Sequence, residues 1–195
     1  QHNEDYVIRK IFARIGAHNK YFVEFGADDG QVVSNTVLLR YDGWRGLLIE
    51  SGNQLPSSLL NATCLRELLT PDNIEPVFEK AGVPKEFDFL SIDIDGNDYY
   101  LWEALKNYRP RVLCIEVDGD SRNTRKLEPY DEEITGSLKC SILVMTELSE
   151  KKGYKLVYNN RGNVFYIDNK DYSHYFKPLA LAKWNEPYVA TVDLF

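Results

Sequence analysis

The chain has 195 residues, 44% of them hydrophobic and 13% aromatic, which is enough to bury a full core and excludes wholesale disorder. Acidic residues outnumber basic residues by 30 to 23, and a chain with a net charge of −7 is a poor binder of nucleic acid phosphates. No apolar run approaches the ~20 residues of a membrane helix, so we expect no membrane partner.

The three cysteines indicate the redox setting. Cys64, Cys114 and Cys140 are too few and too scattered for a disulfide framework or a zinc site. Cys64 and Cys114 lie in apolar runs, where a buried thiol is typical. We therefore expect a reducing, cytoplasmic location.

The predicted elements alternate between helix and strand. Apolar residues at helical spacing, closed by glycine, predict helices, and short apolar runs predict buried strands. In chain order we expect a helix at 4–16, a strand at 21–26, a helix at 36–43, strands at 47–51 and 64–68, a helix at 71–80, a strand at 88–95, a helix at 97–108, a strand at 111–119, a helix at 137–153 and strands at 154–160 and 163–169. Residues 52–63 are expected to form a loop or a short helix.

This order predicts the fold class. Alternating strands and helices are typical of an α/β protein with a mostly parallel, doubly wound sheet. The last two strands are joined by Arg161-Gly162, so an antiparallel C-terminal hairpin strand completes the sheet. At roughly 150 residues per domain, the length predicts one domain over 1–195, with an N-terminal helical segment at 1–20, a core at 21–169 and a C-terminal tail at 170–195.

The ends of the predicted strands carry the candidate ligand site, because ligands of open parallel sheets bind outside the carboxyl ends of the strands. Strand one ends in a turn with Gly26 and Gly30, and glycine lets the backbone turn tightly and lets a ligand approach it. Glu50 ends strand two, twenty residues beyond Gly30, where an acidic side chain accepts hydrogen bonds from ribose hydroxyls. Together these features indicate a nucleoside binder.

The charge of the first turn selects among nucleosides. Asp28 and Asp29 lie where NAD, FAD or ATP would place its phosphates, and at an effective dielectric of about 20 the repulsion amounts to a few kcal/mol. A ligand with an adenosine, a positive charge and no phosphate fits this turn better. S-adenosylmethionine (SAM) has these properties, since its sulfonium and ammonium groups are cationic. The missing middle glycine of G-x-G-x-x-G also disfavours a nucleotide-dependent oxidoreductase.

Seven stretches of the sequence carry a family resemblance. They are VEFGADDG (23–30), SNT (34–36), GWRGLLIES (43–51), TPDNI (70–74), FDFLSIDIDGND (87–98), VLCIEVDG (112–119) and GSL…KKGYKLV (136–157). In this order they resemble the FkbM-like branch of the class I SAM-dependent methyltransferases and cover most of residues 20–168. The resemblance implies a Rossmann-like methyltransferase fold with SAM as the cofactor.

The resemblance also implies roles for single residues. The first SAM motif is matched by 24–30, Glu50 matches the acid that binds ribose, and Asp93 matches the motif that flanks cofactor and acceptor. Asn35 and Ser51, which neighbour these motifs, complete the prediction, although Asn35 also fits the role of a helix cap. The predicted cofactor-binding residues are Glu24, Gly26, Ala27, Asp28, Gly30, Asn35, Glu50, Ser51 and Asp93.

Five carboxylates crowd the ends of the fourth and fifth predicted strands, namely Asp93, Asp95, Asp98, Glu116 and Asp118. Carboxylates that lie close together at one edge of a sheet either raise one another's pKa or share a divalent cation. A hydroxyl acceptor must lose its proton, so we expect Asp93, Asp95 and Glu116 to act in catalysis, as bases or as ligands of a divalent cation. His174 is a further candidate base, and an exposed or packed tail histidine is the alternative.

The sequence thus predicts an enzyme, a SAM-dependent methyltransferase that acts on a hydroxyl of a small or sugar-like acceptor. The choice of oxygen rests on the resemblance and on the acidic cluster. The alternative is a non-catalytic relative that keeps the fold as an interaction or trafficking module, because SNT and GWRG also resemble the animal Star-like proteins. The acids Glu24, Glu50 and Asp93 favour a working pocket.

Overall fold

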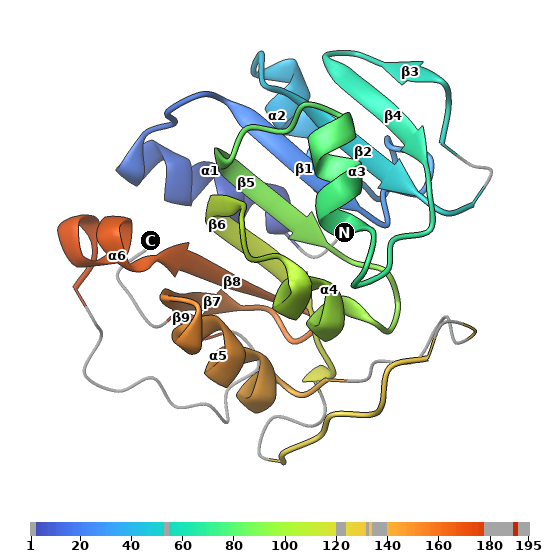
Figure 1. Ribbon diagram of the computed structural model, residues 1–195. Coiled ribbons are helices and arrows are strands. Elements are labelled where there is room, and N and C mark those ends of the chain that lie inside the picture. Colours follow the sequence, from blue (N-terminus) through green and yellow to red (C-terminus); the bar gives the residue numbers. More distant parts are fainter. Residues whose placement is uncertain are drawn as a thin grey trace.

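A nine-stranded mixed sheet organises the computed structural model, which describes residues 3–52, 55–119, 124–131, 133, 140–177 and 189–190 (Figure 1). The strand order is β3-β4-β2-β1-β5-β6-β8-β7-β9. The strands are β1 (Tyr21–Phe25), β2 (Arg45–Glu50), β3 (Ser58–Leu59), β4 (Ala62–Arg66), β5 (Glu86–Ile92), β6 (Arg109–Glu116), β7 (Tyr154–Asn159), β8 (Asn163–Asp168) and β9 (Val189–Ala190).

The central strands run in one direction. β4, β2, β1, β5 and β6 pair in parallel, so their carboxyl ends all lie at one edge of the sheet. β8 then inserts between β6 and β7 and runs antiparallel to both. The predicted fold class, a mostly parallel α/β sheet with an antiparallel strand near its C-terminal end, is confirmed.

Helices cover both faces of this sheet. α3 (Ile74–Lys80), α4 (Asp98–Ala104) and α5 (Ile142–Lys151) pack on one face, and α1 (Glu4–Ile15), α2 (Val37–Tyr41) and α6 (Asn169–Tyr175) pack on the other (Figure 1). Successive strand residues face opposite sides. Val23 and Phe25 therefore belong to the first hydrophobic core, and Phe22 belongs to the second. Both cores need the buried, almost uninterrupted apolar strands that the sequence shows.

Several predicted boundaries differ from the structure. Residues 52–63 contain β3, which pairs antiparallel with β4 through Ser58 and Thr63, so the prediction of a loop or short helix there is wrong. The first helical turn predicted at 71 is a loop held by a hydrogen bond from the Thr70 amide to Asn73 Oδ1 at 2.8 Å, and α3 begins at Ile74. The predicted helix at 137–153 is described from Ile142, and residues 137–139 lie outside the described residues.

A buried ion network closes the amino edge of the sheet. The carboxylate of Asp88 is fully buried and accepts hydrogen bonds from the amides of residues 18–20 and from Arg111 Nη1 at 2.8 Å. Arg111 also pairs with Asp171 of α6 at 2.8 Å. Buried charges are tolerated when they are paired and hydrogen-bonded in this way. This edge therefore holds the loop before β1 and helix α6 against the sheet.

Two further findings concern the membrane and cysteine predictions. In the described part of the chain, none of the helices combines the length and the apolar character that crossing a membrane requires. Cys64, Cys114 and Cys140 are all free thiols.

Candidate active site

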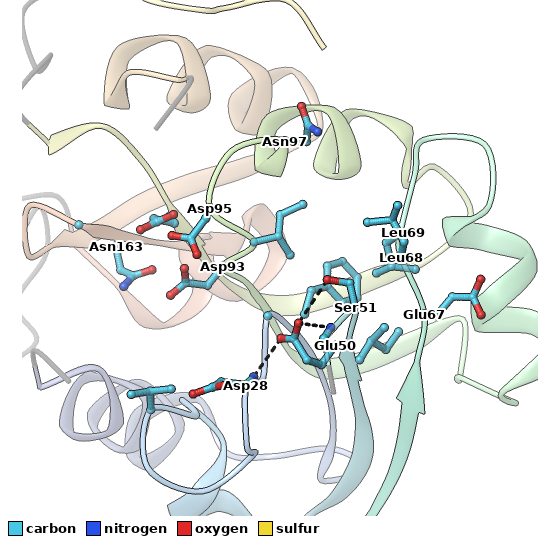
Figure 2. A pocket seen from close by; sticks show the side chains of 18 of the residues that line it. Asp28, Glu50, Ser51, Glu67, Leu68, Leu69, Asp93, Asp95, Asn97 and Asn163 are labelled. Atoms are coloured by element: carbon cyan, nitrogen blue, oxygen red, sulfur yellow. Dashed lines mark hydrogen bonds between the residues drawn. The ribbon is translucent and has the colours of Figure 1, made fainter. Parts of the chain in front are cut away.

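A cavity of about 550 Å³ opens at the carboxyl edge of the parallel strands. The ends of β1, β2, β5 and β6, the segment after β4 and the start of β8 line it. Figure 2 shows Leu68 and Leu69 on one side, Asp93 and Asp95 on the other, and Glu50 between them. We call the two sides the β2 end (Glu50, Ser51, Glu67, Leu68, Leu69) and the β5 end (Asp93, Asp95, Asn97, Glu116, Tyr130, Asn163).

Glu50 is the last residue of β2, and its carboxylate faces the cavity (Figure 2). Its Oε2 accepts a hydrogen bond from the Asp28 amide at 3.0 Å, and its Oε1 accepts one from the Gly52 amide at 2.9 Å. These two bonds orient the carboxylate and connect β2 to the turn after β1. A carboxylate offers about four lone-pair sites, so acceptor capacity remains for an incoming hydroxyl.

The glycines of the first turn serve the fold. Gly26 has a φ of +69°, and a Cβ placed there would lie 1.5 Å from the carbonyl oxygen of Asp93. Gly30 has a φ of +70°, and a Cβ there would lie 2.5 Å from Leu59 Cδ1. Both glycines are thus required by strand–turn packing. Gly26 also lines the cavity, whereas Gly30 does not.

Three predicted cofactor-binding residues, Glu24, Ala27 and Asn35, do not line the cavity and instead are buried in or against the turn after β1. Glu24 is 2% exposed, does not line the cavity, and accepts hydrogen bonds from Ser34 Oγ at 2.7 Å, the Asn35 amide at 2.6 Å and Thr36 Oγ1 at 2.5 Å. Burial raises the pKa of Glu24, and these donors partly oppose that shift. The Asn35 side chain donates to Ser91 Oγ and makes no cap, and Ala27 is buried in the second core. Glu24 therefore anchors segment 34–36.

The two aspartates of the first turn have different surroundings. Asp28 lines the cavity and has a φ of +49°, a conformation that aspartate tolerates better than most residues. Asp29 is turned away, and its carboxylate accepts hydrogen bonds from the amides of Gln31 and Val32. These amides hold the pKa of Asp29 below its ordinary value. Only one of the two predicted carboxylates therefore contributes its charge to the cavity lining.

Three carboxylates meet at the β5 end. One oxygen from each of Asp93, Asp95 and Glu116 lies within 4.8 Å of the others. Burial, then Asp98 and Asp95, raise the pKa of Asp93 to about 7. Burial and then the Asp93 carboxylate raise the pKa of Glu116 to about 9. Glu116 Oε2 is buried and lacks a hydrogen-bond partner among the described residues. The arrangement suits a shared proton or a shared cation.

The two other acids of this region have structural partners. Asp98 is 4% exposed, accepts hydrogen bonds from the amides of Ile94 and Gly96 at 3.0 Å, and so shapes the turn after β5. Burial raises the pKa of Asp98. Asp118 forms an ion pair with Lys126 at 2.9 Å and does not line the cavity. The sequence placed all five acids at one edge, and the tertiary structure selects three of them.

The raised pKa values predict that the ligand-free protein loses stability as the pH rises. Asp93 and Glu116 hold protons more tightly in the folded chain than in the unfolded chain, where their ordinary values are 3.8 and 4.5. Their contribution to stability is complete below these ordinary values and is lost as the pH rises through about 7 and about 9. Without added metal, we expect the thermal midpoint to fall by several degrees between about pH 6 and about pH 9.5.

Lys152 requires a control for this prediction. Burial lowers its pKa to about 8, and a lysine with a lowered pKa gives a contribution of opposite sign, because stability then grows as the pH rises. Glu116→Gln removes one carboxyl titration and leaves Lys152 in place. The midpoint of this variant should fall less than that of the unmodified protein. An equal fall in both proteins would contradict the role assigned to Glu116.

His174 lies outside the site. It is exposed on α6, which follows β8 and lies at the amino edge of the parallel strands, beside the Arg111–Asp171 ion pair. The cavity opens at the opposite, carboxyl edge. The prediction that His174 acts as a base over the acceptor is therefore wrong, because β8 runs antiparallel and carries the following helix away from the cavity.

The lining residues that the strand-end argument missed include Leu68, Leu69, Asn163 and Tyr130. Leu68 and Leu69 follow β4, whose carboxyl end lies at the same edge, so the argument extends to them without change. Asn163 is the first residue of β8 and reaches this edge because β8 is antiparallel. Tyr130 comes from a segment with no periodic pattern, and no sequence signal indicated it.

Comparisons with known proteins address the fold. No family model matches the chain, and the comparison with curated proteins found no match. Among solved structures, an O-methyltransferase from Bacillus cereus in complex with SAH (S-adenosylhomocysteine) aligns with a TM-score of 0.55 and 18% identity, over 85% of this chain and 80% of that one. The magnesium protoporphyrin IX methyltransferase of Synechocystis PCC 6803, with bound SAH, aligns with a TM-score of 0.53 and 9% identity, over 85% and 82%.

A third structure is the 1,6-didemethyltoxoflavin-N1-methyltransferase of Burkholderia thailandensis, with a TM-score of 0.50, 10% identity, and coverage of 86% of this chain and 79% of that one. These proteins share the fold of this chain. At such low sequence identities the likeness concerns the fold alone. The fold is that of the class I SAM-dependent methyltransferases, and the predicted Rossmann-like architecture is confirmed.

Proposed function

We propose that this chain is a SAM-dependent methyltransferase that transfers a methyl group to a hydroxyl of a small or sugar-like acceptor. One observation carries the proposal. The Glu50 carboxylate opens into a cavity of about 550 Å³ whose described lining contains acidic but no basic side chains. The acidic residues are Asp28, Glu50, Glu67, Asp93, Asp95 and Glu116.

This charge distribution fits SAM better than a phosphorylated nucleotide. Carboxylates repel phosphate and attract the sulfonium and ammonium groups of SAM. The remaining lone pairs of Glu50 suit ribose hydroxyls, and Leu68 and Leu69 offer an apolar wall for an adenine ring at the same end. The residues present therefore fit this cofactor at the β2 end.

The β5 end supplies the groups that the transfer needs. When bound, SAM supplies a methyl group that passes from sulfur to the acceptor oxygen, while the electron pair of the broken bond stays on sulfur. The acceptor must release its proton, and Asp93, Asp95 and Glu116 are the carboxylates within reach of one another at this end. The cavity walls would hold the two reactants in line, which is the main source of catalysis in such a displacement.

The same three carboxylates would hold a divalent cation. Oxygen ligands of this kind suit Mg²⁺ or Ca²⁺, and the unpartnered Glu116 Oε2 supports the fit. A cation there would lower the pKa of the acceptor hydroxyl. The choice of oxygen as the methylated atom follows from this acidic cluster and from the resemblance of the motifs to the FkbM-like methyltransferases.

Calorimetric titration with SAM and with SAH tests the proposed function. We expect micromolar dissociation constants for both ligands and no measurable binding of NADH. The titration is repeated with added Mg²⁺, which should alter SAM binding if the cation occupies the β5 end. Lack of binding at millimolar SAM would overturn the proposal and would favour a non-catalytic interaction module with this fold.

A further inference from the structure

The β5 end of the cavity has a polar rim and one aromatic wall. Its described lining residues include the carboxyls of Asp93, Asp95 and Glu116 and the amides of Asn97 and Asn163. Figure 2 shows Asn163 beside Asp93 and Asp95 and facing the same space. The apolar surface there includes Ile94 and the ring of Tyr130. An acceptor at this end therefore meets many hydrogen-bonding groups and one flat ring.

Tyr130 is held firmly in place. Its ring packs edge-to-face against the Tyr100 ring, with centroids 5.6 Å apart and an interplanar angle of 75°. The Tyr100 hydroxyl donates a hydrogen bond to the Glu128 carbonyl at 2.6 Å, and Asn97 Nδ2 donates one to the Asp131 carbonyl at 2.8 Å. The segment that carries Tyr130 is thus pinned to α4 on both sides of that residue. A ring fixed in this way is a preorganised platform.

Charge narrows the acceptor class. The described lining has six acidic side chains and no basic one, so without a bound cation an acceptor with a phosphate or carboxylate would be repelled. A cationic acceptor is disfavoured for a different reason. It would have to approach the sulfonium of SAM closely, and two positive charges repel each other. The acceptor that fits is uncharged.

The polar lining of the β5 end narrows the acceptor class further. A flat aromatic acceptor would need apolar walls on both faces, and the described β5 end offers mostly carboxyls and amides. A saccharide ring is amphipathic, with a face of C–H groups and a rim of hydroxyls. Its C–H face would lie on Tyr130, and its hydroxyls would reach Asp95, Glu116 and Asn163.

We infer that the acceptor is an uncharged saccharide ring that stacks on Tyr130, with Asn97 and Tyr100 as positioning residues. This inference rests on the proposed function, since it places the ring at the acceptor end of the methyltransferase site. It names a substrate class and a specificity-determining residue that the motifs do not include.

The test is saturation-transfer NMR on the SAH-loaded protein with matched small ligands. The neutral probes are the methyl glycosides of glucose, mannose, galactose and fucose, and the charged probes are glucose 6-phosphate and glucosamine. Catechol is the aromatic probe. We expect signal from the ring C–H protons of at least one neutral glycoside, and stronger binding of it than of the other three probes.

Variants separate stacking from folding. Tyr130→Ala should weaken binding of the neutral glycoside by roughly tenfold, which corresponds to the free energy of one aromatic contact. Tyr130→Phe should bind the glycoside as tightly as the unmodified protein does. Tyr41→Ala removes a tyrosine that is 74% exposed on α2 and should leave binding unchanged. Thermal midpoints of all variants check that they fold.

Each contrary outcome overturns the inference. These outcomes are no binding of any neutral glycoside, equal or stronger binding of glucose 6-phosphate, glucosamine or catechol, and undiminished binding by a folded Tyr130→Ala variant. SAM affinity is measured on the same samples by calorimetry. If SAM binds and the glycosides do not, the inference fails and the proposed function stands. If SAM itself does not bind, the proposed function fails.

Discussion

Replacing Gly26 by alanine is expected to lower the free energy of unfolding by about 2–5 kcal/mol, the sum of left-handed backbone strain and overpacking. The added Cβ would lie 1.5 Å from the carbonyl oxygen of Asp93, and neither backbone can move without shifting β1 against β5. The same shift would displace Asp93 from the acidic cluster. Urea unfolding measures the loss, and loss of SAM binding in the remaining folded protein should accompany it.

Gly82 is the matched control for this variant. It has the same φ of +69°, but a Cβ there would meet nothing within 4 Å. Gly82→Ala should therefore show only the backbone strain, about 1–2 kcal/mol. A Gly26→Ala variant that is no less stable than Gly82→Ala would show that β1 and β5 are not packed as closely as described.

Glu50→Gln is expected to weaken SAM binding by roughly tenfold to a hundredfold. Hydrogen bonds to a charged group contribute about 1.5–3 kcal/mol, and the amide keeps the shape of the side chain while it loses the charge and one accepting oxygen. The amide oxygen can still accept from one of the backbone amides of Asp28 and Gly52, but the NH₂ group cannot accept from the other. Calorimetry with SAM and with SAH measures the effect.

Glu67→Gln separates local binding from the general charge of the cavity. Glu67 lines the same β2 end, is exposed, and loses the same charge on substitution. The dissociation constant of Glu67→Gln for SAM should lie within about threefold of that of the unmodified protein, because an exposed charge at the rim of the cavity is screened by solvent. Equal losses in the two variants would contradict the assignment of Glu50 to the ribose and would indicate a purely electrostatic effect.

The strand ends of the site were predictable from the sequence. Apolar runs that stop at Glu50, Asp93 and Glu116 mark the ends of buried strands, and parallel strands bring their carboxyl ends to one edge. The same reasoning applied to β4 would have found Leu68 and Leu69. Local pattern is sufficient here because strand direction is shared.

The role of a residue within a motif was less predictable. Glu24, Gly26 and Asp28 belong to one short stretch, yet Glu24 holds segment 34–36, Gly26 admits the Asp93 carbonyl, and Asp28 lines the cavity. Which face of the sheet a side chain occupies, and what it meets there, depends on residues ten to seventy positions away. The separation between Gly26 and Asp93 is an example.

The amino-acid sequence by itself determined the order of the strands and helices other than β3, α6 and β9, the mostly parallel sheet and the acidic edge, because hydrophobic periodicity and glycine turns act over a few residues. Only the tertiary structure placed Tyr130 and Asn163 in the cavity and His174 at the opposite edge. These positions follow from the antiparallel insertion of β8 and from long-range hydrogen bonds to α4, which no local pattern encodes.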